Sequence, residues 1–253
     1  MLTFSEAQVL EWLSPLLWPF IRVLALFTTA PVLSQRFVPR RVRVALAALI
    51  VVCAQPSLPP MPAIPLDSTT AFMAVIAQVL IGLSLGFAAR IVFAAVEFAG
   101  ELVGLQMGLN YAGFFDPATG GQATAVSRFY GTIVSWMFII INGHLLIIGA
   151  VVRSFNSFPV NAEPFAFLRV LNPQIWGAEI FSLGLWIALP MVAMLLFVNL
   201  VLGIISRVAS QMNVFAVGFP ITLGVGLIGM LLTLPMMQAP FTMALERMLS
   251  LFV

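Results

Sequence analysis

The chain has 253 residues, of which 62% are hydrophobic and 8% are charged, against roughly 25% charged residues in soluble domains. This composition excludes an ordinary water-soluble domain and predicts an all-α, membrane-associated protein, because helices satisfy their own backbone hydrogen bonds in lipid. The formal net charge of +2 leaves no general basic face, so we expect no nucleic-acid partner.

The beginning of the chain is expected to cross a bilayer poorly without neighbours. Residues 8 to 33 are apolar but contain two prolines and Arg22. A basic run at 36 to 43 suits the cytoplasmic flank of a membrane helix, although it could also bind anionic lipid or the acids of a partner. The apolar stretch at 44 to 54 has about half of the roughly 20 residues that a span needs. The proline-rich run at 56 to 65 is a stiff connector.

One long helix is expected from near Thr70 to about residue 110, because the residues at 67 to 69 carry oxygens that can cap its first turn. Two glutamates and an arginine on this helix are spaced by seven and four residues, which puts them on one stripe. The carboxylates could couple ions, and a salt-bridged helix end is the simpler interpretation. The candidate buried charge network is Arg90, Glu97, Glu101 and, after the next loop, Arg128.

Glycines recur at four-residue intervals along this helix, at 82 and 86 and again at 100, 104 and 108. Small residues at this spacing let two helix backbones approach closely where packing drives association. The later set follows nearly the same stripe as the two glutamates. We therefore predict that Gly100, Gly104 and Gly108 pack against a helix of a partner protein.

The rest of the chain brings the number of expected hydrophobic helices to about six. Residues 129 to 152 and 180 to 206 are uncharged, and the last apolar region is interrupted by SQMNVFAVGFP, which predicts a helical hairpin turning at 211 to 220. That tip mixes polar and turn-forming residues with aromatic ones, a mixture that suggests contact with another protein surface. The predicted contact residues are Gln211, Asn213, Phe215, Gly218 and Pro220.

The stretch YAGFFDPATGGQAT lies between two of the most apolar parts of the chain. A loop that only had to cross water would be polar throughout, since turn residues alone satisfy its backbone. Two adjacent phenylalanines beside an Asp-Pro and a Gly-Gly therefore indicate a functional loop. Its candidate residues are Tyr111, Gly113, Phe114, Phe115, Asp116, Pro117, Gly120 and Gly121.

Catalytic signatures are absent from the sequence. There is one histidine, one cysteine and no GxSxG, HExxH or P-loop pattern, so we expect neither an enzyme nor a metal or cofactor site. His144 could be a proton relay, but a single histidine in a membrane segment more often makes an interhelical hydrogen bond. Cys53 can form no disulfide within this chain.

Three stretches together resemble the FliR family of flagellar biosynthesis proteins, which are export-gate components of type III secretion. The first is RVLALFTTAPVLSQRFVPRRVRVALAALI. The second is EFAGELVGLQMGLNYAGFFDP followed by NGHLLII, and the third is RVASQMNVFAVGFPITLGVGL. The resemblance covers nearly the whole chain in order. Two positions depart from the family pattern, with Ser210 in place of a proline and Thr222 in place of a lysine.

The resemblance implies a non-enzymatic component of a gate in the bacterial inner membrane, at the flagellar basal body. FliP and FliQ would be its partners in a cone of helical hairpins around the pore that unfolded flagellar subunits enter, with FlhB around the gate and membrane lipid outside. It also implies a FliP-like part at 1–172 and a FliQ-like helical hairpin at 173–253. Residues 111–122 match the family's plug, so Phe114 and Phe115 would seal the pore with a ring of partner methionines.

Two other functions stay open on the residues alone. An injectisome homologue would have the same gate and export toxic effectors. An ion-coupled secondary transporter could place Glu97, Glu101 and Arg128 at a midplane site. A transporter of that kind is expected to contain inverted repeats. The two halves of this chain differ in length and in their pattern of apolar and polar residues, so no such repeat is seen.

Overall fold

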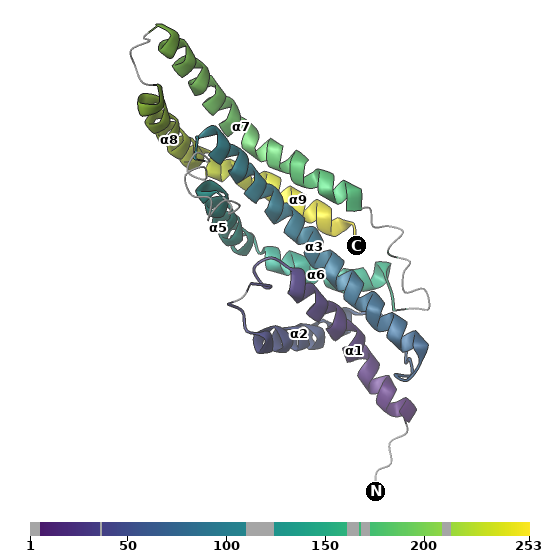
Figure 1. Ribbon diagram of the computed structural model, residues 1–253. Helices are drawn as coiled ribbons and strands as arrows, with labels where there is room; N and C mark the ends of the chain where they lie inside the picture. Colours follow the sequence, from purple (N-terminus) through teal and green to yellow (C-terminus); the bar gives the residue numbers. More distant parts are fainter. Residues whose placement is uncertain (1–5, 36, 110–123, 161–166, 168–172, 209–213) are drawn as a thin grey trace. The chain divides into compact units, whose positions relative to one another are not determined.

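The computed structural model describes the whole chain except residues 1–5, 36, 110–123, 161–166, 168–172 and 209–213 (Figure 1). The described residues contain helices and no strand, which confirms the predicted all-α class. The helices are α1 (Glu6–Thr29), α2 (Arg40–Ala54), η1 (Gln55–Ser57), α3 (Thr69–Gln106), α5 (Ala125–Ile140), α6 (Gly143–Ser157), α7 (Pro173–Val208), α8 (Val214–Thr233), η3 (Leu234–Met237) and α9 (Gln238–Ser250).

Four segments of the described chain are long and apolar enough to cross a membrane, and the bent pair α5 and α6 makes a fifth if it counts as one span. The four are Leu10–Thr29, Thr69–Gln106, Gln174–Val208 and Ala216–Ser250. The protein is therefore an all-α membrane protein, as its composition predicted.

Two expected element boundaries are wrong. The apolar stretch at 129 to 152 is not one helix, because α5 and α6 meet at a bend of 68° where Asn142 adopts a left-handed conformation with φ 56°. The turn expected at 211 to 220 does not extend beyond residue 213, since α8 begins at Val214. Gly218 and Pro220 are residue types that are common in turns, but here both lie within α8.

The start of α3 follows the predicted capping chemistry. The hydroxyl Oγ of Ser68 accepts a hydrogen bond from the amide of Ala71 at 3.1 Å, which satisfies one of the amide groups that the first turn of a helix leaves without a partner. The helix then runs without interruption for 38 residues to Gln106.

The chain divides into two compact units that are each described separately. Unit 1 comprises Met1–Ile91, Ile139–Trp176 and Leu245–Val253, and unit 2 comprises Val92–Phe138 and Gly177–Ala244. Each unit therefore gathers segments that are far apart in the sequence.

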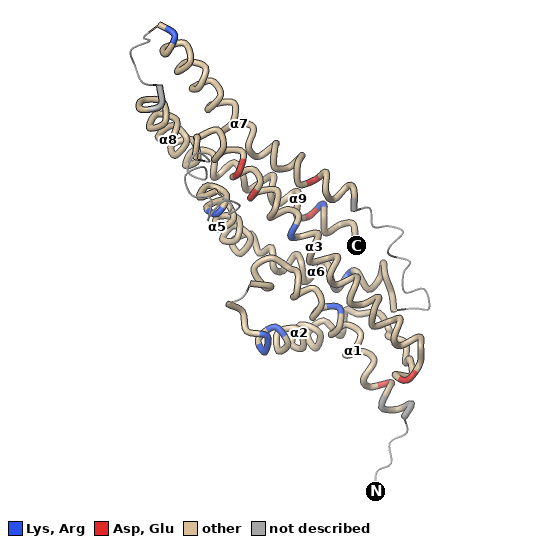
Figure 2. Tube along the Cα trace, in the orientation of Figure 1, with Lys and Arg blue, Asp and Glu red and all other residues tan. Residues whose placement is uncertain are grey.

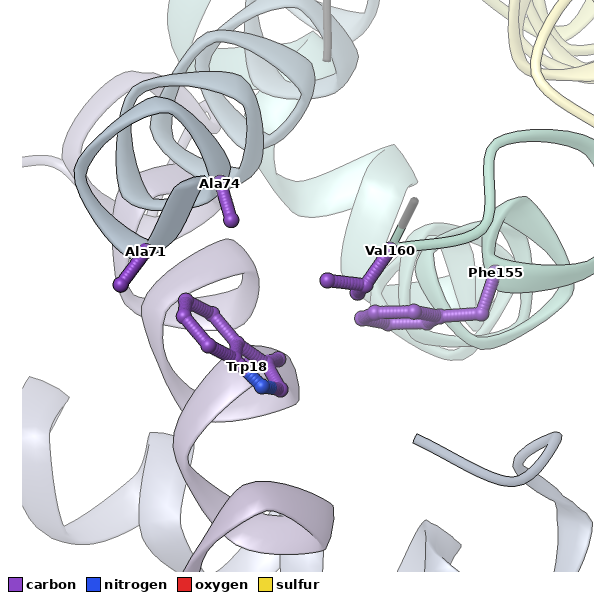
Figure 3. Packing of buried hydrophobic residues seen from close by; sticks show 5 residues of the cluster. All are labelled: Trp18, Ala71, Ala74, Phe155 and Val160. Carbon is purple, nitrogen blue, oxygen red and sulfur yellow. The ribbon is translucent and has the colours of Figure 1, made fainter. Parts of the chain in front are cut away.

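The core of unit 1 is built around a tryptophan. Figure 3 shows Trp18 of α1 beside Ala71 and Ala74 of α3, with Phe155 and Val160 facing it from the other side. Apolar side chains of the proline-rich connector, among them Leu58 and Ile64, pack against this cluster. The connector thus covers part of the core.

Unit 1 also contains a fully buried arginine. The Arg22 guanidinium donates hydrogen bonds from Nε to the Gln78 side chain at 2.8 Å, from Nη1 to Ser154 Oγ at 2.9 Å and from Nη2 to the Phe158 carbonyl at 2.7 Å. Its Cζ lies 3.6 Å from the ring centroid of Phe155. Neutral acceptors and an aromatic face therefore surround this cation and link α1, α3 and α6.

Glycines bring α1 and α3 close together in unit 1. A Cβ added to Gly82 would lie 2.8 Å from Cβ of Ala25 and 3.0 Å from the backbone nitrogen of Leu26, and one added to Gly86 would lie 2.8 Å from the nitrogen of Ala30. Real Cβ atoms essentially never approach other atoms more closely than 3.0 Å. The glycine spacing seen in the sequence thus marks a close helix contact within the chain.

Candidate functional site

The candidate functional loop itself, with all eight of its predicted residues from Tyr111 to Gly121, lies outside the described residues. Both of its ends are described, on α3 and α5 of unit 2. We call residues 97–109 and 124–131 together the loop base.

The α3 side of the loop base ends in a Schellman motif. Gly108 has φ 79°, its amide donates to the Leu105 carbonyl at 3.1 Å, and the amide of Leu109 donates to the Gly104 carbonyl at 3.1 Å. Glycine adopts this left-handed conformation without steric penalty, which is why helices often end on it. Gly108 therefore terminates α3, and its packing against a partner helix stays a prediction.

The α5 side begins with a capping threonine. Thr124 Oγ1 accepts the amide of Ser127 at 3.2 Å, and the Thr124 carbonyl accepts the amide of Arg128 at 3.0 Å. The amide of Thr124 in turn donates to Glu101 Oε1 on α3 at 2.9 Å. In a capping box a glutamate of the same helix bonds this amide, and here α3 supplies it, with its negative charge at the positive end of α5.

The two helices of the loop base approach through glycines. A Cβ on Gly100 would lie 2.7 Å from Cα of Ser127, and one on Gly104 would lie 3.0 Å from Oγ1 of Thr124. Residue numbers rise along α3 as they fall along α5, so the helices run antiparallel. Ser127 Oγ also donates to the Glu97 carbonyl at 2.9 Å. These glycines are thus covered by the chain's own α5, and their faces are not available to a partner helix.

The four residues of the candidate charge network have different surroundings. Glu101 is half-buried, and its carboxylate bonds the backbone of Thr124. Glu97 is exposed, with Oε1 packed over Gly131. Arg128, at the start of α5, and Arg90, in unit 1, are also exposed. The charge network remains a prediction, while the bond from Thr124 to Glu101 is a structural fact.

Met107 fixes the loop base to α8. It is fully buried, and a Cβ on Gly226 would lie 2.6 Å from its Cε and Cγ atoms. The buried Thr222 hydroxyl donates to the Phe219 carbonyl at 3.1 Å and lies 3.4 Å from the Met107 carbonyl. A buried position facing a carbonyl suits threonine, the residue that departs from the family pattern.

Sequence reasoning missed Thr124, Ser127 and Met107. The pattern Thr-x-x-Ser ahead of an apolar run was a usable signal for the cap. No spacing rule identifies Met107, because its role depends on a glycine in another helix.

The other predicted residues are only partly described. Gln211 and Asn213 of the hairpin tip, and the side chain of Phe215, lie outside the described part. Gly218 is buried in α8 and Pro220 is exposed there. His144 is the second residue of α6, and its Nδ1 is buried with no hydrogen-bond partner among the described residues, so this nitrogen does not make the expected interhelical bond.

The described residues contain no group of three or more histidine, cysteine or acidic side chains that could hold a metal ion. Hydrogen bonds and glycine contacts fix the two ends of residues 110–123 at one place on α3.

Comparison with known proteins places this geometry in context. Residues 13–248 match the family model described as bacterial export proteins, family 1. The chain is 42% identical over 241 residues to the flagellar biosynthetic protein FliR of Pectobacterium carotovorum, covering 95% of this chain and 92% of the relative. It is 42% identical over 244 residues to FliR of Escherichia coli with the same coverage, and 28% identical over 255 residues to FliR of Bacillus subtilis.

Proposed function

The chain belongs to family 1 of the bacterial export proteins and is a component of the flagellar export apparatus, and we propose that it forms the export gate together with FliP and FliQ. In this proposal it lies in the bacterial inner membrane at the flagellar basal body, with FlhB around the gate, and unfolded flagellar subunits pass through. The names of its relatives favour flagellar subunits over injectisome effectors as cargo. Its role is structural, without catalysis.

Residues 111–122 are the plug of this gate. The observation that carries the assignment is that both ends of 110–123 are fixed to the same part of α3, through Leu109 and Gly104 on one side and Thr124 and Glu101 on the other. A chain of 14 residues that leaves and returns at one place can reach about 20 Å from its base, since an extended residue covers at most about 3.5 Å. That reach suffices to cross a pore for an unfolded polypeptide.

The composition of the plug suits a seal that cargo can displace. Phe114 and Phe115 would form an apolar constriction, which excludes ions because it does not wet. Glycines and Pro117 allow the loop to turn, and Asp116 can cap a turn. The hydrogen bonds of the loop base would hold both helices in place while the loop moves.

The uncovered apolar surface of the chain supports a complex with other membrane proteins. Of the most apolar 18-residue window in each span, only 22% is buried in Gln174–Val208 and 28% in Ala216–Ser250, against 61% in Thr69–Gln106. We propose that residues 173–253 are a FliQ-like hairpin and residues 1–172 a FliP-like part, and that neighbouring subunits cover this surface. A secondary transporter is less favoured, because Oε1 of the half-buried Glu101 already accepts the amide of Thr124 at a helix end.

The plug is tested by replacing residues 112–122 with a short polar linker that leaves Leu109 and Thr124 in place. We expect the complex with FliP and FliQ to assemble normally, because the contacts of the loop base are unchanged. We also expect increased ion conductance in cells that express it. Phe114→Ser with Phe115→Ser should have the same effect, and Phe72→Ser, at a 62% exposed position on α3 in unit 1, is the matched control. Normal conductance in an assembled complex would refute the plug.

A further inference from the structure

Helix α2 is too short to cross a bilayer and differs from the spans around it. Its 15 residues cover about 22 Å at 1.5 Å per residue, less than the roughly 30 Å of a hydrocarbon core. Only Ala47 and Val51 are buried. The helix therefore uses one narrow small-residue face for packing within unit 1, and most of its surface is uncovered.

That uncovered surface is apolar. Val42 is 51% exposed, Leu49 60% and Val52 58%, and Phe37, just before the helix, is 71% exposed. No charged residue follows Arg43 in the helix. In water such a surface would favour association with other molecules, so it needs an apolar environment.

The charges of α2 all lie at one end, as Figure 2 shows. Arg40 and Arg41 are exposed, and Arg43 Nη2 donates to the Gln35 carbonyl at 2.7 Å. The sequence has no acidic residue between Glu11 and Asp67. Cations at the start of a helix oppose its dipole, so this cluster does not serve helix stability. It creates a local positive potential for an external anion.

We propose that α2 binds anionic phospholipid, with its charged end among the headgroups and its uncharged end in the acyl region of one leaflet. Its arginines bond headgroup phosphates, for which the guanidinium fork is well shaped, and its apolar surface enters the acyl region. Lipid is the occupant that fits because charge and apolar surface are separated along the helix axis, in the order of headgroup and hydrocarbon in one leaflet. This surface is distinct from the loop base, so the proposal does not depend on the gate.

The single cysteine of the chain provides a direct probe. Cys53 is exposed near the uncharged end of α2, so a nitroxide can be attached to the full-length chain without any other substitution. The labelled protein is reconstituted in nanodiscs of phosphatidylcholine, alone or mixed with phosphatidylglycerol. We expect phosphatidylglycerol to raise the accessibility of the label to oxygen relative to a water-soluble nickel reagent. A label that is equally accessible to the nickel reagent in both membranes would overturn the proposal.

Arginine variants identify the source of that response. The fraction of phosphatidylglycerol that gives half of the change in label accessibility should rise about fivefold in Arg40→Gln and in Arg41→Gln. Each basic residue near an anionic surface raises the membrane affinity by about that factor. Arg207→Gln, at an exposed arginine in the last turn of α7, should leave it unchanged. An equal effect of Arg207→Gln would refute the assignment to α2. High salt should weaken the response of the unaltered protein, and a salt-independent response would equally refute it.

Discussion

In each unit, α3 approaches one other helix through two of its own glycines that lie four residues apart. In unit 1, the backbone of α1 packs against Gly82 and Gly86. In unit 2, the start of α5 packs against Gly100 and Gly104. The contacts differ in the charged group beside them. Arg22 in unit 1 is fully buried and bonds three acceptors, whereas Glu101 in unit 2 is half-buried and bonds one backbone amide.

The same four-residue glycine spacing therefore builds a core in unit 1 and fixes the base of a loop in unit 2. Helices in apolar surroundings gain little from hydrophobic burial, so close packing and hydrogen bonds decide which of them associate. The hydrogen bonds of Arg22 reach residues that lie 56, 132 and 136 positions away along the chain. They therefore hold together a core that is built from distant segments. The Glu101 bond connects α3 to the first residue before α5, so it fixes the loop base.

The largest expected effect comes from filling the glycine contacts. Gly100→Leu and Gly82→Leu should each destabilise the protein by more than about 4 kcal/mol, because backbone atoms occupy the space of the new side chain. Thermal unfolding in detergent, followed by far-UV circular dichroism, measures the loss. Gly203→Leu is the control, since nothing lies within 4 Å of a Cβ there, and it should be neutral or slightly stabilising. Equal stability of all three variants would show that the helices do not meet at these glycines.

The next effect separates the two charged groups. Arg22→Met should destabilise unit 1 by about 3 kcal/mol, because the buried acceptors Gln78 and Ser154 and the Phe158 carbonyl lose their donor. Arg22→Lys should recover only part of the loss, since one ammonium cannot reproduce the guanidinium fork. The same unfolding measurement applies, with Arg207→Lys as the exposed control. A methionine variant as stable as the original would mean that desolvation of the cation outweighs its hydrogen bonds.

The smallest effect concerns the loop base. Thr124→Ala removes the side-chain cap of α5 and should cost about 1 kcal/mol, whereas Thr124→Ser should be nearly neutral. Hydrogen exchange of the amides in the first turn of α5 is the suitable measurement, because fraying there precedes global unfolding. Unchanged exchange in the alanine variant would indicate that the bond from Thr124 to Glu101 alone fixes this helix end.

The sequence by itself determined the all-α membrane class, a cap for α3 at residues 67 to 69 and the glycine spacings, because apolar composition, helix caps and helical periodicity are local properties of a chain. It also indicated the family, through motifs that are spread over its length. It did not determine what covers each glycine. The spacing predicted a partner helix at Gly100, whereas α5 of the same chain packs there.

Only the tertiary structure decided the acceptors of Arg22, the bend at Asn142 and the pairing of Met107 with Gly226. Each depends on atoms brought together from distant positions, and a helical face has the same pattern whatever lies against it. Residue spacing specifies which side chains share a face, and the fold alone specifies what that face contacts.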